Sequence, residues 1–97
     1  MKKAIIYVRG NKEEMQEIIC RLYASDKNYK VLYITNNIDD VNLCDTMIIS
    51  NPSRISRNQL EYYEVINNFK KKNITVEIAT QHEKYNDFFH TAITLLN

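Results

Sequence analysis

The sequence predicts an α/β three-layer sandwich, in which a four-stranded parallel sheet of order 2-1-3-4 is flanked by helices. Segments rich in β-branched residues alternate with segments in which apolar residues recur every three or four positions. This alternation is typical of parallel strands joined by right-handed helical crossovers. The chain has 97 residues with one glycine and one proline, so no linker divides it and we expect a single domain, 1–97.

Four segments are predicted to be strands. Nearly continuous apolar runs mark three of them, residues 4–8 (AIIYV), 30–35 (KVLYIT) and 46–50 (TMIIS), which predicts strands covered on both faces. The fourth, residues 74–80 (ITVEIAT), alternates apolar with more polar residues, as an edge strand does. The connection at 36–45 is too short for a full crossover helix but long enough for one or two helical turns.

Three helices are predicted from apolar residues at helical spacing. The first two stripes are Met15, Ile18, Ile19 and Leu22, and then Tyr62, Val65, Ile66 and Phe69. The third stripe is Tyr85, Phe88, Phe89, Ala92 and Leu96. Ser56 is followed three residues later by Gln59, a capping-box pattern that predicts the start of the second helix.

The charge balance limits the classes of function. Thirteen basic and twelve acidic residues give a formal net charge of +1, so a strongly basic nucleic-acid module is not indicated and any anion site must be local. Cys20 and Cys44 form no C-x-x-C pair and are predicted to be buried free thiols, which fits the cytoplasm. The apolar run near the N-terminus is too short for a signal peptide or a membrane span, so we expect a cytoplasmic protein without membrane contact.

No cofactor or metal is expected from the sequence. His82 and His90 have no carboxylate or thiol at ligand spacing, and the lone Gly10 belongs to neither glycine-rich phosphate-binding pattern. Asp39 and Asp40 are better explained as caps of a turn than as cation ligands.

Three arginines follow predicted strands that should be neighbours. In a sheet of order 2-1-3-4, ligands bind beyond the carboxyl ends of the first and third strands. Arg9 follows the first strand, whereas Arg54 and Arg57 follow the third at the start of a helix, where free N–H groups also favour anions. Guanidinium groups suit phosphate, so the spacing predicts a phosphate or similar anion site. The alternative is that the arginines are solvated or paired with Asp39, Asp40 or Asp45.

At these positions the chain resembles the catalytic domain of serine recombinases, the resolvase/invertase family. That family opens with a strand ending Y-x-R-V-S and later carries D-R-[LI]-x-R where a helix follows the third strand. Here the motifs stand as YVRGN (7–11) and SRISR (53–57), and the resemblance covers about residues 2–80. It implies a resolvase-like fold and DNA cleavage by a serine that attacks a phosphodiester, with arginines stabilising the transition state. The residues that it implies for phosphate or DNA binding are Arg9, Arg54, Arg57 and Asn11.

The chain departs from the family at the residues that perform the reaction. Asn11 occupies the nucleophile position, and a carboxamide cannot form the phosphoserine link. Ser53 occupies the position of the family's acid, and Met15 stands where a glutamine is usual. The connection at 36–45 lacks the family's further active-site arginine. We therefore expect no catalytic residue.

The resemblance implies an inactive homologue with an accessory or regulatory role in DNA recombination, in a mobile-element context. Its partners would be backbone phosphate of DNA, another anion or a recombinase. One alternative is a protein–protein interaction module without a DNA role, such as a homodimer formed through the apolar face of the third helix. Another is an active strand transferase with its nucleophile relocated to Ser53 or Ser56.

Overall fold

The computed structural model describes residues 1–81. Its strands are β1 (Lys3–Tyr7), β2 (Lys30–Thr35), β3 (Thr46–Ile49) and β4 (Thr75–Ile78). Its helices are α1 (Glu13–Lys27) and α2 (Gln59–Lys71), and its short 3-10 helices are η1 (Ile38–Asp40), η2 (Pro52–Arg54) and η3 (Ala79–Gln81). The predicted third helix and both histidines lie outside the described residues.

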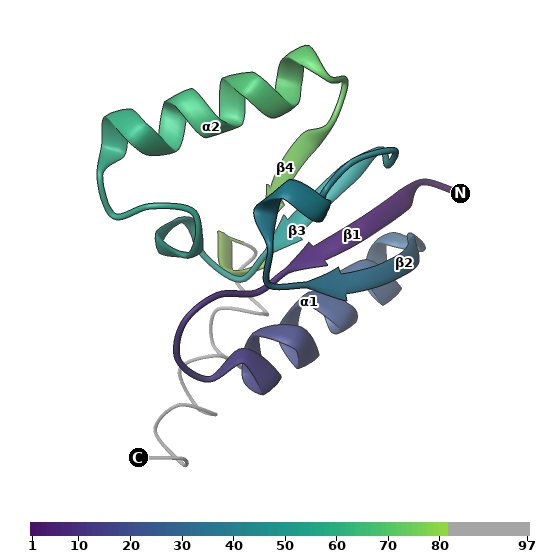
Figure 1. The fold of residues 1–97 in the computed structure, drawn as a ribbon. Helices are drawn as coiled ribbons and strands as arrows, with labels where there is room; N and C mark the ends of the chain where they lie inside the picture. The colour runs from purple at the N-terminus through teal and green to yellow at the C-terminus, as the bar shows by residue number, and fades with distance from the viewer. Residues whose placement is uncertain (82–97) are drawn as a thin grey trace.

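The strands form one parallel sheet in the order β2-β1-β3-β4, with α1 on one face and α2 on the other (Figure 1). The predicted α/β sandwich, its strand order and the short helical turn in 36–45 are therefore confirmed. The single domain over 1–97 stays a prediction.

Each face of the sheet carries its own core, because side chains alternate along the two central strands. The α1 side consists of Ala4, Ile6, Val8, Ile19, Cys20, Tyr23, Ala24, Ile48 and Ala79. The α2 side consists of Ile5, Tyr7, Val41, Met47, Ile49, Ile55, Phe69 and Ile74. The central strands β1 and β3 are thus buried on both faces, as their apolar runs predict.

The prediction that residues 30–35 are covered on both faces is only partly confirmed. β2 lies at an edge of the sheet, and Tyr33 is 43% exposed. Val31 and Ile34 pack partly against the α1 side and Leu32 against the α2 side. A strand with one neighbour is covered only where a helix reaches it, so apolar content alone did not reveal the edge. The edge position predicted for β4 is confirmed.

The buried face of α1 is rotated by about one residue from the predicted stripe. Ile18 and Leu22 are 44% and 42% exposed. The buried residues are Gln16, Ile19, Cys20, Tyr23 and Ala24, which follow the same helical spacing. A glutamine thus occupies a core position, and its amide bonds to the loop after β1. The cysteines are both free: Cys20 is buried, which raises its pKa to about 12, whereas Cys44 is half-buried.

The second helix begins later than predicted. Asn58, not Ser56, is its N-cap: the Asn58 side chain accepts a hydrogen bond of 3.1 Å from the Glu61 N–H. The Ser56 hydroxyl accepts from the Asn58 N–H at 3.0 Å and donates to the Glu61 carboxylate at 3.2 Å. Asn and Ser are equally good caps, so local sequence could not decide between them. The predicted apolar stripe of α2 packs on the core as expected.

Candidate anion-binding site

The loop after β1 turns sharply at the carboxyl end of the sheet. Gly10 has φ +83°, a conformation that glycine adopts without strain. A Cβ at this position would lie 3.4 Å from Nη1 of Arg54, which is tight. Gly10 therefore lets the loop turn while the Arg54 side chain approaches its backbone.

Gln16 holds this loop in place. Its Oε1 accepts a hydrogen bond from the Arg9 N–H at 3.0 Å, and its Nε2 donates to the carbonyls of Arg9 and Asn11, each at 2.9 Å. Gln16 was not among the predicted site residues, because the family's glutamine position falls on Met15, one residue earlier. The available signal was its helical spacing from Ile19, Cys20 and Tyr23, which places it on the buried face.

The segment after β3 is shaped by Asn51. Its Oδ1 accepts from the Ser53 N–H at 3.1 Å and also from the Ser53 hydroxyl. These bonds fold residues 52–54 into η2, and buried Ile55 anchors the turn in the α2-side core. Arg54 leaves from η2, and Arg57 follows from the exposed turn before α2.

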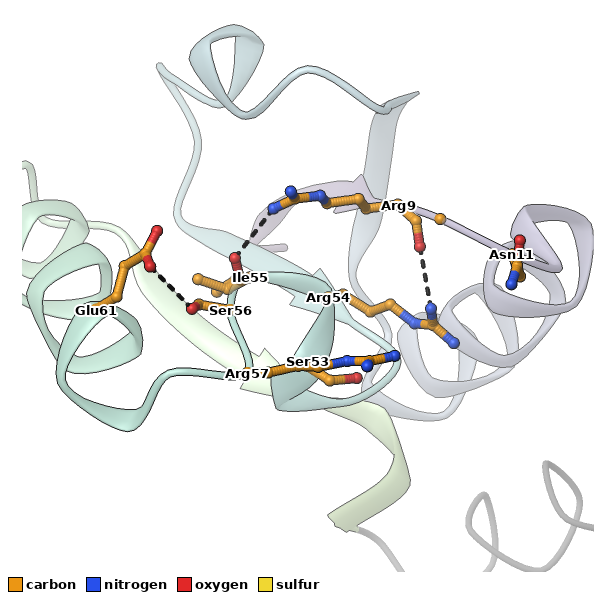
Figure 2. Close-up of a pocket in the computed structure, with 9 residues that line it drawn as sticks. Arg9, Asn11, Ser53, Arg54, Ile55, Ser56, Arg57 and Glu61 are labelled. Carbon is orange, nitrogen blue, oxygen red and sulfur yellow. Dashed lines mark hydrogen bonds between the residues drawn. The ribbon is translucent and has the colours of Figure 1, made fainter.

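Both loops line one cavity of about 380 Å³. The cavity, shown in Figure 2, is lined by all four residues proposed from the sequence: Arg9, Asn11, Arg54 and Arg57. Its other lining residues are Gly10, Ser53, Ile55, Ser56 and Glu61. The strand order explains the meeting, because β1 and β3 are neighbours and their carboxyl ends point the same way.

Two of the arginines brace the loops against each other. Nη1 of Arg9 donates to the Ile55 carbonyl at 3.2 Å, and Nη1 of Arg54 donates to the Arg9 carbonyl at 3.1 Å. Figure 2 shows the Arg9 guanidinium turned toward Ile55, whereas the Arg54 guanidinium lies by the Arg9 carbonyl. The three arginines line one cavity, but their guanidinium groups do not point at a single spot.

No carboxylate in residues 1–81 forms an ion pair with Arg9, Arg54 or Arg57. Two of the three acids named as possible partners are engaged elsewhere: Asp45 accepts from the Lys3 N–H at 2.8 Å, and Asp40 accepts from the Thr35 hydroxyl at 3.0 Å. Burial, and then the positive charge of Arg57, lower the pKa of Arg54. The Arg54 Nε is buried and has no hydrogen-bond partner within residues 1–81. Three arginines and one acid, Glu61, therefore line the cavity, and within residues 1–81 the Glu61 carboxylate bonds to Ser56 and forms no ion pair with an arginine.

The described part of the chain contains no group of three or more His, Cys, Asp or Glu side chains that could hold a metal ion. None of the helices within residues 1–81 is both long and apolar enough to cross a membrane.

Comparison with known proteins supports the fold and leaves the activity open. No protein-family model matches the sequence, and no curated protein matches it. A solved structure is similar, that of the C-terminal catalytic domain of ISC1926 TnpA, an IS607-like serine recombinase. The TM-score is 0.64 at 19% identity, over 79% of this chain and 68% of that chain. The chain therefore has an α/β fold similar to that of a serine recombinase catalytic domain.

Proposed function

We propose that this chain is a recombinase-like accessory or regulatory domain that binds backbone phosphate of DNA without cleaving it. One observation carries the proposal: three arginines without acidic partners in residues 1–81 line a single cavity at the carboxyl ends of β1 and β3. The fold similarity to the catalytic domain of an IS607-like serine recombinase supports the recombination context.

An anion in this cavity would stabilise groups that are now unfavourably placed. The positive charges of Arg54 and Arg57 repel, and a phosphate near both would offset that repulsion. A side-on phosphate could also accept from Arg54 Nε after a small change of rotamer, and a buried N–H without a partner costs about 1–3 kcal/mol. The fork of a guanidinium matches two phosphate oxygens, which favours phosphate over a halide.

The residues at the family's reactive positions argue against strand cleavage. Asn11 lines the cavity with a carboxamide, which is not a nucleophile toward phosphorus. The Ser53 hydroxyl is tied to the Asn51 side chain, in the turn that forms η2. We therefore propose that the site binds phosphate as a ligand and does not transfer it.

A binding experiment with matched charge removal tests the proposal. We expect the wild type to bind inorganic phosphate and a short labelled DNA duplex at low salt. Arg54→Ala and Arg57→Ala should each weaken binding by about tenfold or more, the loss expected for a charge-assisted hydrogen bond. The control is Arg21→Ala: Arg21 pairs with Glu17 on α1, does not line the cavity, and carries the same charge.

Equal losses in all three variants would mean nonspecific charge attraction and would overturn the proposed site. Unchanged binding in Arg54→Ala and Arg57→Ala would also overturn it. Absence of binding by the wild type would favour the interaction module without a DNA role. Thermal unfolding of each variant separates lost binding from lost folding.

A second candidate function, strand transfer by a relocated serine, is favoured by one observation. The Ser56 hydroxyl lies at the cavity and donates to the Glu61 carboxylate at 3.2 Å, as a nucleophile does to a general base. The same bond also stabilises the start of α2. We expect no covalent protein–DNA product from supercoiled DNA; a product lost in Ser56→Ala or Ser53→Ala would replace the binding proposal with this one.

A further inference from the structure

Gln16 is a fully buried polar side chain on the otherwise apolar inner face of α1. Within residues 1–81 its amide makes three hydrogen bonds, and all of them go to the backbone of Arg9 and Asn11, on either side of Gly10. A buried amide must bond all its polar groups or destabilise the fold. Because Gln16 itself is fixed in the core, its hydrogen bonds fix the position of the loop relative to the core.

The Arg9 carbonyl links this anchor to the arginines. It accepts from Gln16 Nε2 at 2.9 Å and from Arg54 Nη1 at 3.1 Å. The orientation of the Arg54 guanidinium therefore depends on where that carbonyl lies. Gly10 makes the loop intrinsically permissive. Without Gln16, the bond from the Arg54 side chain would be the one hydrogen bond left to hold the Arg9 carbonyl among residues 1–81.

We propose that Gln16 is the positioning residue of the anion site, acting through the Arg9 carbonyl on Arg54 and through the Asn11 carbonyl on the end of the loop. The inference rests on the proposed function, although Gln16 does not line the cavity. Gln16 would thus support ligand binding from the buried face of α1, which an apolar residue of similar size could not do.

The variant Gln16→Met keeps the length of the side chain and removes all three hydrogen bonds. We expect the NMR signals of the Arg54 Nε–H and of the Arg9 and Asn11 amides to move, while those of β4 stay in place. Phosphate affinity should fall by about tenfold, the effect of misaligning one charge-assisted bond. The control is Gln59→Met, at the exposed first residue of α2, which should change neither these NMR signals nor the phosphate affinity.

The NMR result needs no ligand, so it separates this inference from the proposed function. If the wild type binds no phosphate, the proposed function fails while the movement of the Arg54 signal still tests the link from Gln16. An unmoved Arg54 signal and unchanged affinity in folded Gln16→Met would overturn the inference.

A wild-type measurement covers the case in which Gln16→Met does not fold. On phosphate titration, the Gln16 side-chain amide signals should shift together with that of Arg54, because both groups bond to one carbonyl. Amide signals of Gln16 that stay fixed while Arg54 responds would overturn the inference.

Discussion

The surroundings of Glu77 favour its charged form, whereas burial and the charge of Arg57 disfavour the charged form of Arg54. It accepts from Tyr23 at 2.5 Å, from Tyr29 at 3.0 Å to both oxygens, and from Thr46 at 2.9 Å. Burial would raise the pKa of Glu77, but these hydrogen bonds and the charge of Lys2 outweigh it, and the pKa lies below its ordinary value. Three hydroxyl donors and the charge of Lys2 thus stabilise this half-buried carboxylate, which points to a structural role.

The variant Glu77→Gln should lower the free energy of unfolding at pH 7 by about 1–2 kcal/mol, a range reduced for the partial exposure of the side chain. The depressed pKa fixes the sign: the contribution of Glu77 is present above its unfolded value of about 4.3 and is lost as pH falls through the folded pKa. The difference between wild type and variant should therefore shrink on acidification. Urea unfolding at pH 7, 5 and 3 measures it.

The exposed Glu64 of α2 supplies the control, since Glu64→Gln removes the same charge from solvent. A difference for Glu77→Gln that stays constant from pH 7 to pH 3 would show that shape rather than charge stabilises this cluster.

At the residue scale, the positions of the three arginines were predictable from the sequence, whereas the buried hydrogen bonds of Gln16 and Glu77 were not. Arg9, Arg54 and Arg57 could be placed because they follow strand ends whose order was predictable. Gln16 and Glu77 could not, because a lone polar residue in a helix or an edge strand is usually solvated. Only the approach of another segment shows that it is buried and bonded.

At the element scale, the orientation of α1 decides which side chains reach the core. A helical stripe can be shifted by one residue without losing its periodicity, so the apolar pattern allowed two registers. The register that places Gln16 inward exposes Ile18 and buries Ile19 completely. The start of α2 was equally ambiguous, because both Ser56 and Asn58 are followed three residues later by a capping-box partner.

Ile19→Ala and Ile18→Ala form a matched pair that tests this register. Ile19→Ala removes buried methyl groups and should cost about 2–4 kcal/mol of unfolding free energy, with a cavity left behind. Ile18 is 44% exposed, so Ile18→Ala should cost less than about 1 kcal/mol. Urea denaturation monitored by circular dichroism gives both values. Equal costs would mean that α1 is rotated toward the predicted stripe.

At the scale of the whole molecule, the strand order brings the two loops of the site together. Parallel strands and right-handed crossovers bring residues 9–11 beside residues 51–57, although some forty positions separate them. This meeting follows from strand order alone and was predictable. The directions of the guanidinium groups were not, because they depend on carbonyls that only the folded loops bring within reach.

The charge distribution of the molecule predicts how DNA binding responds to salt. Net charge is only +1, so three arginines at one cavity should set the response. A plot of log K against log salt concentration for a duplex should have a slope of about −2 to −3, and Arg54→Ala should reduce its magnitude by about 0.9.

The basic end of α2 provides the control for that measurement. Lys71 ends the helix, about 20 Å along its axis from its first residue near the cavity. This distance exceeds the Debye length of about 8 Å at physiological salt, so Lys71→Ala should leave the slope unchanged. A slope steeper than about −5 would require more phosphate contacts than three arginines can make. That result, or an equal effect of Lys71→Ala, would assign binding to a broad basic surface instead of the cavity.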